Sequence, residues 1–171
     1  MRGAHARPLA LNEVLKRGRL TLSVQYAVPS RGLPVRATLQ RWIAAALERE
    51  AALTLRFVGL AEGRRLNARF RGKDYATNVL TFVYDGPSHD APRDAPGGIP
   101  VAGDIVVCVP VLRREAHAAG RSLRAHCAHL VVHGVLHLQG YDHMRDRDAV
   151  RMERQEADIL RRFRYADPYA R

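Results

Sequence analysis

The histidines between residues 133 and 143 have the type and spacing of a metal site. His133 and His137 lie one helical turn apart, so both imidazoles would leave the same face of a helix. Gly140 follows as a natural helix stop, because glycine accepts the left-handed conformation that a C-terminal cap requires. The chain can then turn back and bring His143 towards the other two rings. Three neutral imidazoles around one point predict one bound Zn²⁺ whose fourth coordination position is open to water or substrate.

The spacing of these histidines equals that of the metzincin motif H-E-x-x-H-x-x-G-x-x-H, with one departure. Gly134 stands where those proteases carry the glutamate that acts as general base. The sequence therefore predicts a zincin-like metal cage without the proteolytic base. A metalloprotease is kept as one alternative function, because the cage itself matches.

Other side chains compete for the role of ligand. His126 and His129 fall within the same narrow arc of the predicted helix and are interpreted as core residues or as groups that orient a ligand, but they are also the main rivals as ligands. Cys127 lies off that arc and is interpreted as a buried thiol. His89 lies in a loop rich in proline and glycine and is interpreted as an exposed loop histidine.

Two blocks carry a resemblance to a known family. Residues 133–143 resemble the H-G-x-L-H-L-x-G-Y-D-H signature of the YbeY family, the bacterial rRNA maturation endoribonucleases. Residues 66–82 are similar to that family's L-N-x-x-Y-R-G-K-D-x-x-T-N-V-L-S-F. Phe70 replaces the commoner tyrosine and Thr81 the commoner serine, and both departures are mild.

The resemblance covers most of the chain, from about residue 20 to residue 169. The tripeptides at 103–105 and 167–169 also fit the family, whereas residues 1–19 and 85–101 carry little of the likeness. It implies a zincin-like architecture and a zinc-dependent endoribonuclease specific for single strands. That enzyme would act in 16S rRNA 3′-end maturation and ribosome quality control.

The resemblance also implies site residues and partners. Arg71 matches a functional arginine of the family and is predicted to be catalytic together with His133, and Arg71 and Lys73 are predicted to bind RNA. The implied partners are single-stranded RNA, the 16S rRNA precursor and the ribosome, with a ribosomal protein or an assembly GTPase as further partners. A non-catalytic ribosome assembly factor with a structural zinc is a second alternative, although such a zinc is normally closed by four protein ligands.

The expected chemistry is hydrolysis or transfer at a phosphodiester. Zinc lowers the pKa of bound water and polarises a phosphoryl oxygen, and a fixed arginine offers always-charged donors to the charge that develops. Asp104 and Asp142 are candidates for orienting a ligand or a water, although capping a turn explains each of them more simply. The sequence leaves open whether water or the RNA 2′-hydroxyl attacks.

Composition supports an intracellular partner of high negative charge. The chain has 171 residues, 28 Lys and Arg against 17 Asp and Glu, and a formal net charge of +11. Charge alone does not separate an RNA partner from an arginine-rich solvated surface, and the metal site and the resemblance favour RNA. Two cysteines without a C-x-x-C spacing, and no long apolar segment, favour a reducing cytoplasm and no membrane partner.

The remaining patterns predict an α+β domain, with a small mixed sheet packed by helices around a central metal-binding helix. Residues 1–19 form a basic arm or an extra helix, and residues 20–171 form the single metal-dependent hydrolase domain. Glu156 falls near the apolar stripe of the last helix, which indicates a buried structural pairing. The predicted strands are 20–28, 53–57, 79–84 and 105–109, the predicted helices are 34–49, 61–71, 110–120, 123–139 and 146–163, and a long loop is predicted at 85–103.

Overall fold

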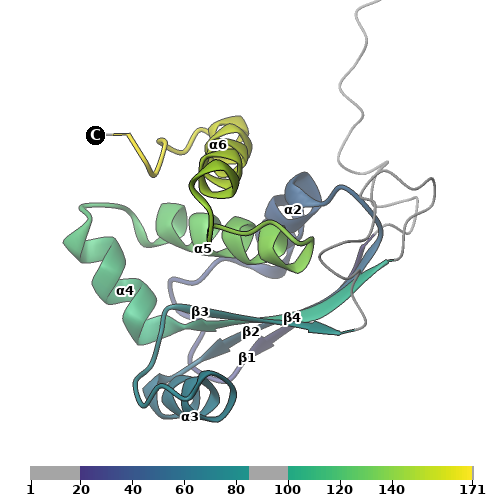
Figure 1. Ribbon diagram of the computed structural model, residues 1–171. Helices are drawn as coiled ribbons and strands as arrows, with labels where there is room; N and C mark the ends of the chain where they lie inside the picture. Colours follow the sequence, from purple (N-terminus) through teal and green to yellow (C-terminus); the bar gives the residue numbers. More distant parts are fainter. Residues whose placement is uncertain (1–19, 85–99, 171) are drawn as a thin grey trace, which may run out of the picture.

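The computed structural model describes residues 20–84 and 100–170 as one α+β domain (Figure 1). Its mixed sheet has the strand order β1-β2-β4-β3, in which β1, β2 and β4 run parallel and β3 runs antiparallel to β4. The strands are β1 Leu20–Tyr26, β2 Ala51–Val58, β3 Val79–Tyr84 and β4 Val101–Cys108. The helices are α2 Arg36–Ala46, α3 Leu60–Arg71, α4 Val109–Ala118, α5 Leu123–Leu138 and α6 Asp146–Arg162. The mixed sheet and the single domain confirm the expected fold class.

The helices lie on both faces of this sheet. Helix α3 covers one face, whereas α5 crosses the other face with α2 beside it and α6 on its outer side (Figure 1). The apolar run of strand β4 is continuous because the strand is buried between these layers on both faces. Ile105 and Val107 belong to the core under α5, and Val106 and Cys108 belong to the smaller core under α3. In the described ranges, no helix is long and apolar enough to span a bilayer.

The predicted loop at 85–103 was too long, because residues 101–103 belong to strand β4. The strand begins at Val101 and pairs with Ala51 of β2, and its last residue is Cys108 because Val109 already belongs to α4. Gly103 was a misleading loop signal, since it lies inside this strand. A Cβ at that position would lie 2.4 Å from the Phe82 carbonyl oxygen and 2.9 Å from Leu138 Cδ2. The glycine therefore permits a close approach of backbone and helix, and does not mark a turn.

Other predicted boundaries hold to within a few residues. The helix predicted at 34–49 is shorter, because it ends at Ala46 with Leu47 already extended. The predictions at 61–71, 79–84 and 123–139 are confirmed almost to the residue. The predicted segment at 1–19, most of the predicted loop and His89 lie outside the described residues.

Helix α5 is central, and one of its glycines permits a close approach to the sheet. Ser122 caps its N-terminus, because the side-chain oxygen accepts a hydrogen bond from the Ala125 backbone N–H at 3.1 Å. A Cβ on Gly134 would lie 3.0 Å from Ile105 Cγ2, so the helix lies close to β4 there. A side chain at 134, such as the glutamate of the metzincin motif, would require the Ile105 side chain to shift by a few tenths of an ångström.

Candidate metal centre

The structure brings His133, His137 and His143 together at the C-terminal end of α5. The ring centroids of His133 and His137 are 4.5 Å apart, those of His137 and His143 are 4.9 Å apart, and those of His133 and His143 are 5.8 Å apart. One nitrogen from each ring lies within 4.8 Å of the others. Three nitrogens at this separation can converge on a single ion.

The turn after α5 delivers the third ring. Gly140 adopts a φ of +87°, and the Tyr141 N–H returns to the Leu136 carbonyl at 3.1 Å, which closes the helix. The Asp142 carboxylate then accepts the backbone N–H of His143 at 2.7 Å and that of Met144 at 3.2 Å. Asp142 therefore fixes the loop that carries His143, the simpler of its two interpretations.

Hydrogen bonds to Nδ1 define which nitrogen of two rings faces the ion. His137 Nδ1 donates to the Tyr141 carbonyl at 2.9 Å, and His133 Nδ1 donates to the Glu156 carboxylate at 2.7 Å. A carbonyl and an ionised carboxylate can only accept, so the proton must lie on Nδ1 in both rings. Nε2 of each is left as the ligand atom, in the arrangement by which proteins orient metal-bound histidines. The donor set therefore fits a zinc ion.

The charge state of His137 also suits a metal. Burial and the neighbouring His133 and His143 lower the pKa of His137 to about 4, so this imidazole is neutral at pH 7. A neutral ring keeps the lone pair that a cation needs, and no proton has to leave when the ion binds.

Glu156 is the fixed anion behind this cluster. Its side chain is fully buried on the inner face of α6, and it accepts hydrogen bonds from His133, from His129 at 2.8 Å and from the Tyr169 hydroxyl. Burial raises the pKa of Glu156, but the hydrogen bonds from His129 and His133 and the electrostatic attraction of the two rings together outweigh burial and lower the pKa to about 2. The buried pairing predicted for this residue is confirmed, and its partners are His133, His129 and Tyr169.

The two rival histidines have other partners. His126 Nε2 lies 2.9 Å from Glu115, which also accepts from the Asn78 side chain at 3.0 Å. His129 shares Glu156 with His133, and these three side chains form a second grouping with donor atoms within 4.8 Å of one another. In that grouping the Glu156 oxygens already accept hydrogen bonds from both rings and from the Tyr169 hydroxyl, which favours His129 as a donor to the carboxylate.

Cys127 and Asp104 lie away from the cluster. Burial raises the pKa of the Cys127 thiol to about 12, so it is the buried thiol that was expected. Asp104 pairs with Phe82 on the sheet face covered by α3, and its carboxylate accepts from the Tyr84 hydroxyl at 2.5 Å. The structure therefore does not bring Asp104 to the histidines, because alternation along β4 points it through the opposite face.

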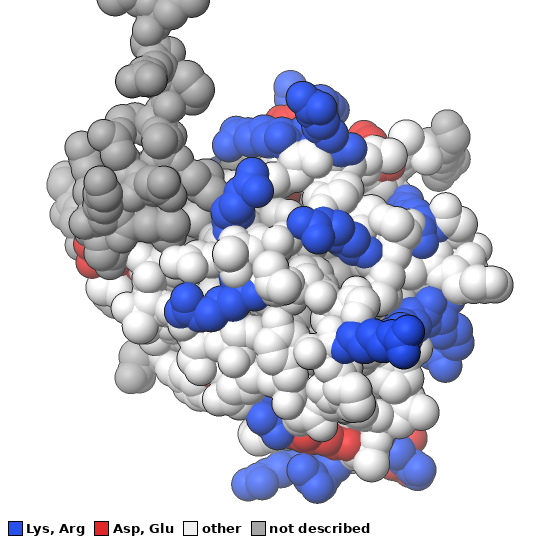
Figure 2. Space-filling view, turned by 180° about the vertical axis from the view of Figure 1, so that it is seen from behind, with Lys and Arg blue, Asp and Glu red and all other residues white. Residues whose placement is uncertain are grey.

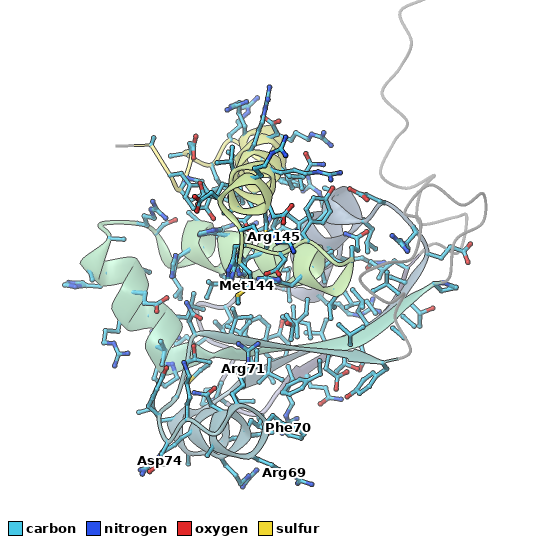
Figure 3. The ribbon with its side chains drawn as sticks, viewed as in Figure 1. Arg69, Phe70, Arg71, Asp74, Met144 and Arg145 are labelled. Atoms are coloured by element: carbon cyan, nitrogen blue, oxygen red, sulfur yellow. The ribbon has the colours of Figure 1, made fainter. Side chains whose placement is uncertain are left out.

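Arg71 and Lys73 lie at the exposed end of α3. Gly72 closes this helix at a φ of +66°, and the Arg64–Asp74 ion pair, with distances of 2.7 and 2.6 Å, fastens the following loop to the helix. Asn67 is buried under the same loop and donates to the Tyr75 carbonyl at 2.7 Å. In Figure 3 the Arg71 side chain points from α3 towards the edge strand β3.

Sequence reasoning missed what Glu156 and Tyr169 do together. The signal was an acidic residue on the inner stripe of an otherwise charged helix, because such a position is occupied only when the charge has partners. The tripeptide at 167–169 was noted only for its likeness to a family. Its tyrosine closes over the carboxylate from the end of the chain.

Comparisons with known proteins point to one family. A family model described as "Endoribonuclease YbeY" matches residues 32–164. Relatives with that name include those from Nitrosospira multiformis, 52% identical over 98% of this chain and 87% of the relative. Another is from Nitrosomonas eutropha, 51% identical over 86% of this chain and 97% of the relative. A solution structure from Thermotoga maritima is 22% identical, with a TM-score of 0.54, and covers 88% of this chain and 100% of that one, which shows the fold alone.

The ligand set can be tested by metal content. Replacing His133, His137 or His143 by alanine should lower bound zinc by more than about tenfold, because each change removes one of three ligands. His117→Ala removes an exposed histidine of α4 and should leave the metal in place, as should His126→Ala. Mass spectrometry of the metal after dialysis measures it. Full retention of zinc in His143→Ala would mean that the assignment is wrong.

The carboxylate can be tested separately from the ligands. Glu156→Gln keeps the shape but removes the charge that orients His133, so zinc affinity should fall by about 10- to 100-fold. Glu153→Gln on the exposed side of the same helix is the matched control. Competition with a chelator measures the affinity, and circular dichroism checks the fold. An unchanged affinity in a folded Glu156→Gln protein contradicts the role given to this residue.

Proposed function

The chain belongs to the YbeY endoribonuclease family, and we propose from that premise that it is a zinc-dependent endoribonuclease that cuts single-stranded RNA. Its proposed task is 16S rRNA 3′-end maturation and ribosome quality control in the cytoplasm. The proposed partners are the 16S rRNA precursor and the ribosome, with a ribosomal protein or an assembly GTPase.

One observation carries this proposal. Three histidines converge at the end of a buried helix, and the exposure of their side chains is graded. His133 and His137 are half-buried, whereas His143 is exposed on the loop after the helix. An ion held there would contact the protein on the side of His133 and His137 and would be open to a substrate on the exposed side of His143.

The proposed chemistry divides the work among few groups. The bound zinc would supply an acidified water and a polarised phosphoryl oxygen. Glu156 would keep the proton of His133 on Nδ1, so that this ring stays turned towards the ion. Arg71 would hold the phosphoryl oxygens as their negative charge grows, and Lys73 would hold the neighbouring backbone.

The two alternative functions have less support. A protease of the metzincin type needs a base at position 134, where this chain has Gly134, which has no side chain to act as a base. A structural zinc needs four protein ligands, and within the described ranges the cluster of His133, His137 and His143 contains no fourth histidine, cysteine or acid.

The function is tested by comparing substrates. The protein should cut an unstructured single-stranded RNA, should lose this activity when a chelator removes the metal, and should regain it when zinc is returned. The same preparation should leave an unfolded polypeptide intact. Cleavage of the polypeptide but not of the RNA would overturn the proposal in favour of a protease.

Arg71 is tested by separating binding from cleavage. Arg71→Ala should lower the rate of cleavage of saturating RNA by on the order of 10²–10³, because a donor aimed at the scissile phosphate acts mainly in the transition state. The matched control is Arg161→Ala, which removes an exposed arginine that pairs with Asp158 at 2.9 Å. Both variants should keep their zinc. Single-turnover cleavage is measured beside RNA binding in chelator, and a wild-type rate for Arg71→Ala would make Arg71 a binding residue only.

A further inference from the structure

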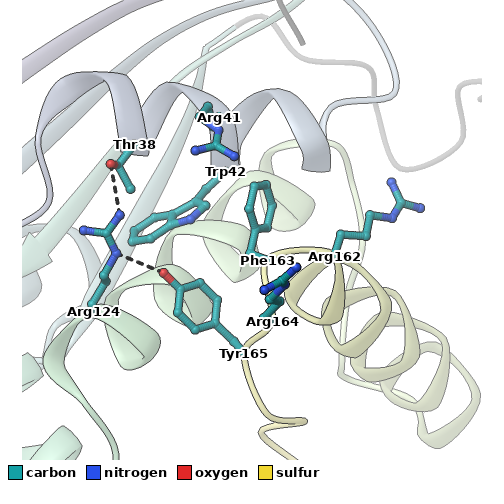
Figure 4. Close-up of a pocket in the computed structure, with 8 residues that line it drawn as sticks. All are labelled: Thr38, Arg41, Trp42, Arg124, Arg162, Phe163, Arg164 and Tyr165. Atoms are coloured by element: carbon teal, nitrogen blue, oxygen red, sulfur yellow. Dashed lines mark hydrogen bonds between the residues drawn. The ribbon is translucent and has the colours of Figure 1, made fainter. Parts of the chain in front are cut away.

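A hollow lined by arginines and aromatic rings lies apart from the histidines. Its volume is about 320 Å³, and it is formed by α2, the first turn of α5, and the end of α6 with the turn that follows (Figure 4). The guanidinium groups come from Arg41, Arg124, Arg162 and Arg164, and the rings are those of Trp42, Phe163 and Tyr165.

The hollow belongs to a different face of the molecule from the candidate metal centre. Arg124 and His133 are nine residues apart on α5. At 3.6 residues per turn this spacing directs them to opposite sides of the helix, about 14 Å apart along its axis. A ligand in the hollow would therefore not be the group that is cut at the histidines.

Two of the guanidinium groups are held in place before any ligand binds. Arg124 donates to the Tyr165 hydroxyl at 3.2 Å and to the Thr38 hydroxyl at 3.3 Å, and its guanidinium carbon lies 5.8 Å from the centre of the Trp42 ring. Arg41 lies over Phe163 at the same distance of 5.8 Å. Such contacts lower the loss of side-chain freedom when an anion binds.

Among residues 20–84 and 100–170, the arginines of the hollow have no acidic partner. In the described part of the chain, none of the four forms an ion pair, whereas Arg56, Arg64 and Arg161 each pair with a carboxylate. Four like charges around one hollow repel each other unless an anion lies between them. Figure 2 views the molecule from behind, the side on which α2 lies, and shows Lys and Arg spread over this face with few acidic residues among them.

The backbone at Arg164 is a further sign that the hollow is built for a ligand. Arg164 has a φ of +63°, the one non-glycine residue with a positive φ in the described ranges. It follows the last turn of α6, where the Tyr165 N–H returns to the Leu160 carbonyl at 3.1 Å and a glycine is the favoured residue. The chain thus keeps an arginine at a position where the fold alone favours glycine.

We propose that this hollow binds phosphate groups of a second RNA segment, away from the strand that is cut. Planar guanidinium groups match the oxygens of a phosphate, and the half-exposed Phe163 and Tyr165 offer surfaces on which bases can stack. That the phosphates belong to RNA rests on the proposed function. The consequence is a two-point grip, so that long RNA binds more tightly than a short strand that reaches the metal centre only.

The test variant is Arg41→Ala combined with Arg164→Gly. It removes two charges, and glycine relieves the left-handed backbone at 164, so the unfolding temperature should stay the same or rise. Binding of a long oligouridylate is measured in chelator, which prevents cleavage. The slope of log affinity against log salt should fall by about 1.4, since each phosphate contact with a single strand contributes about 0.7. Affinity near 0.1 M salt should fall by on the order of tenfold.

The control variant is Arg154→Ala combined with Arg161→Ala. It removes two exposed arginines of α6 that lie outside the hollow. It should change the slope and the affinity far less. Equal losses in both variants would overturn the proposal, because they would reflect net charge only. Unchanged affinity in the test variant of a protein that cuts RNA would also overturn it, whereas loss of affinity in a protein that cuts no RNA would leave the hollow standing and remove the proposed function.

Trp42 provides a direct probe, because it is the only tryptophan of the chain and lies under Arg124. Its fluorescence should change when oligouridylate is added in chelator, and more weakly with inorganic phosphate at the same phosphate concentration. An equal response to both would assign the hollow to free phosphate. A response to polyglutamate as strong as that to RNA would assign it to an acidic protein, and either result would overturn the proposal.

Discussion

The buried carboxylate of Glu156 is the interaction on which the candidate metal centre depends. A charge with no exposed surface is costly unless its hydrogen-bonding capacity is met, and here His133, His129 and Tyr169 meet it. These donors come from the central helix and from the end of the chain, so one anion ties α6 and the C-terminal segment to α5. Because one of the donors is a candidate metal ligand, the same contact that makes α6 dock also sets the tautomer of that ring. Stability and site geometry therefore share a residue.

Helix α5 has a different task on each of its faces. Towards the sheet, each close contact has a glycine on one side. Gly134 of α5 lies against Ile105, and Gly103 of β4 lies against Leu138, so the helix packs closely on β4. Towards α6 it carries histidines, and at its first turn Arg124 faces α2 and the end of α6. A helix packed on so many sides is a rigid support for ligands, and only the short loop after Gly140 has to be positioned independently. The hydrogen bonds that Asp142 accepts supply that positioning.

The sequence predicted best those features that depend only on neighbouring residues in the chain. Ser122, Gly72 and Gly140 mark helix ends through backbone chemistry that depends on few neighbours, and the helices they bound were predicted closely. Gly103 misled, because a glycine in a loop-like run can equally serve close packing, and only the tertiary structure separates the two. Asp104 was kept as a candidate beside the histidines for a related reason. Alternation along a strand defines two faces but does not say which face meets the helix that carries the histidines. Strand order and the partners of Glu156 depend on contacts between distant segments, for which a single sequence holds no local signal.

The most direct test of the central claim is the X-ray absorption spectrum at the zinc edge of the zinc-loaded full-length protein. The account predicts three imidazole nitrogens and one light atom from solvent, with no sulfur. Glu156→Gln should keep this ligand set while binding the metal more weakly, because the carboxylate orients a ligand and does not itself bind the ion. A sulfur ligand, a closed set of four protein ligands, or a carboxylate oxygen lost in Glu156→Gln would contradict it.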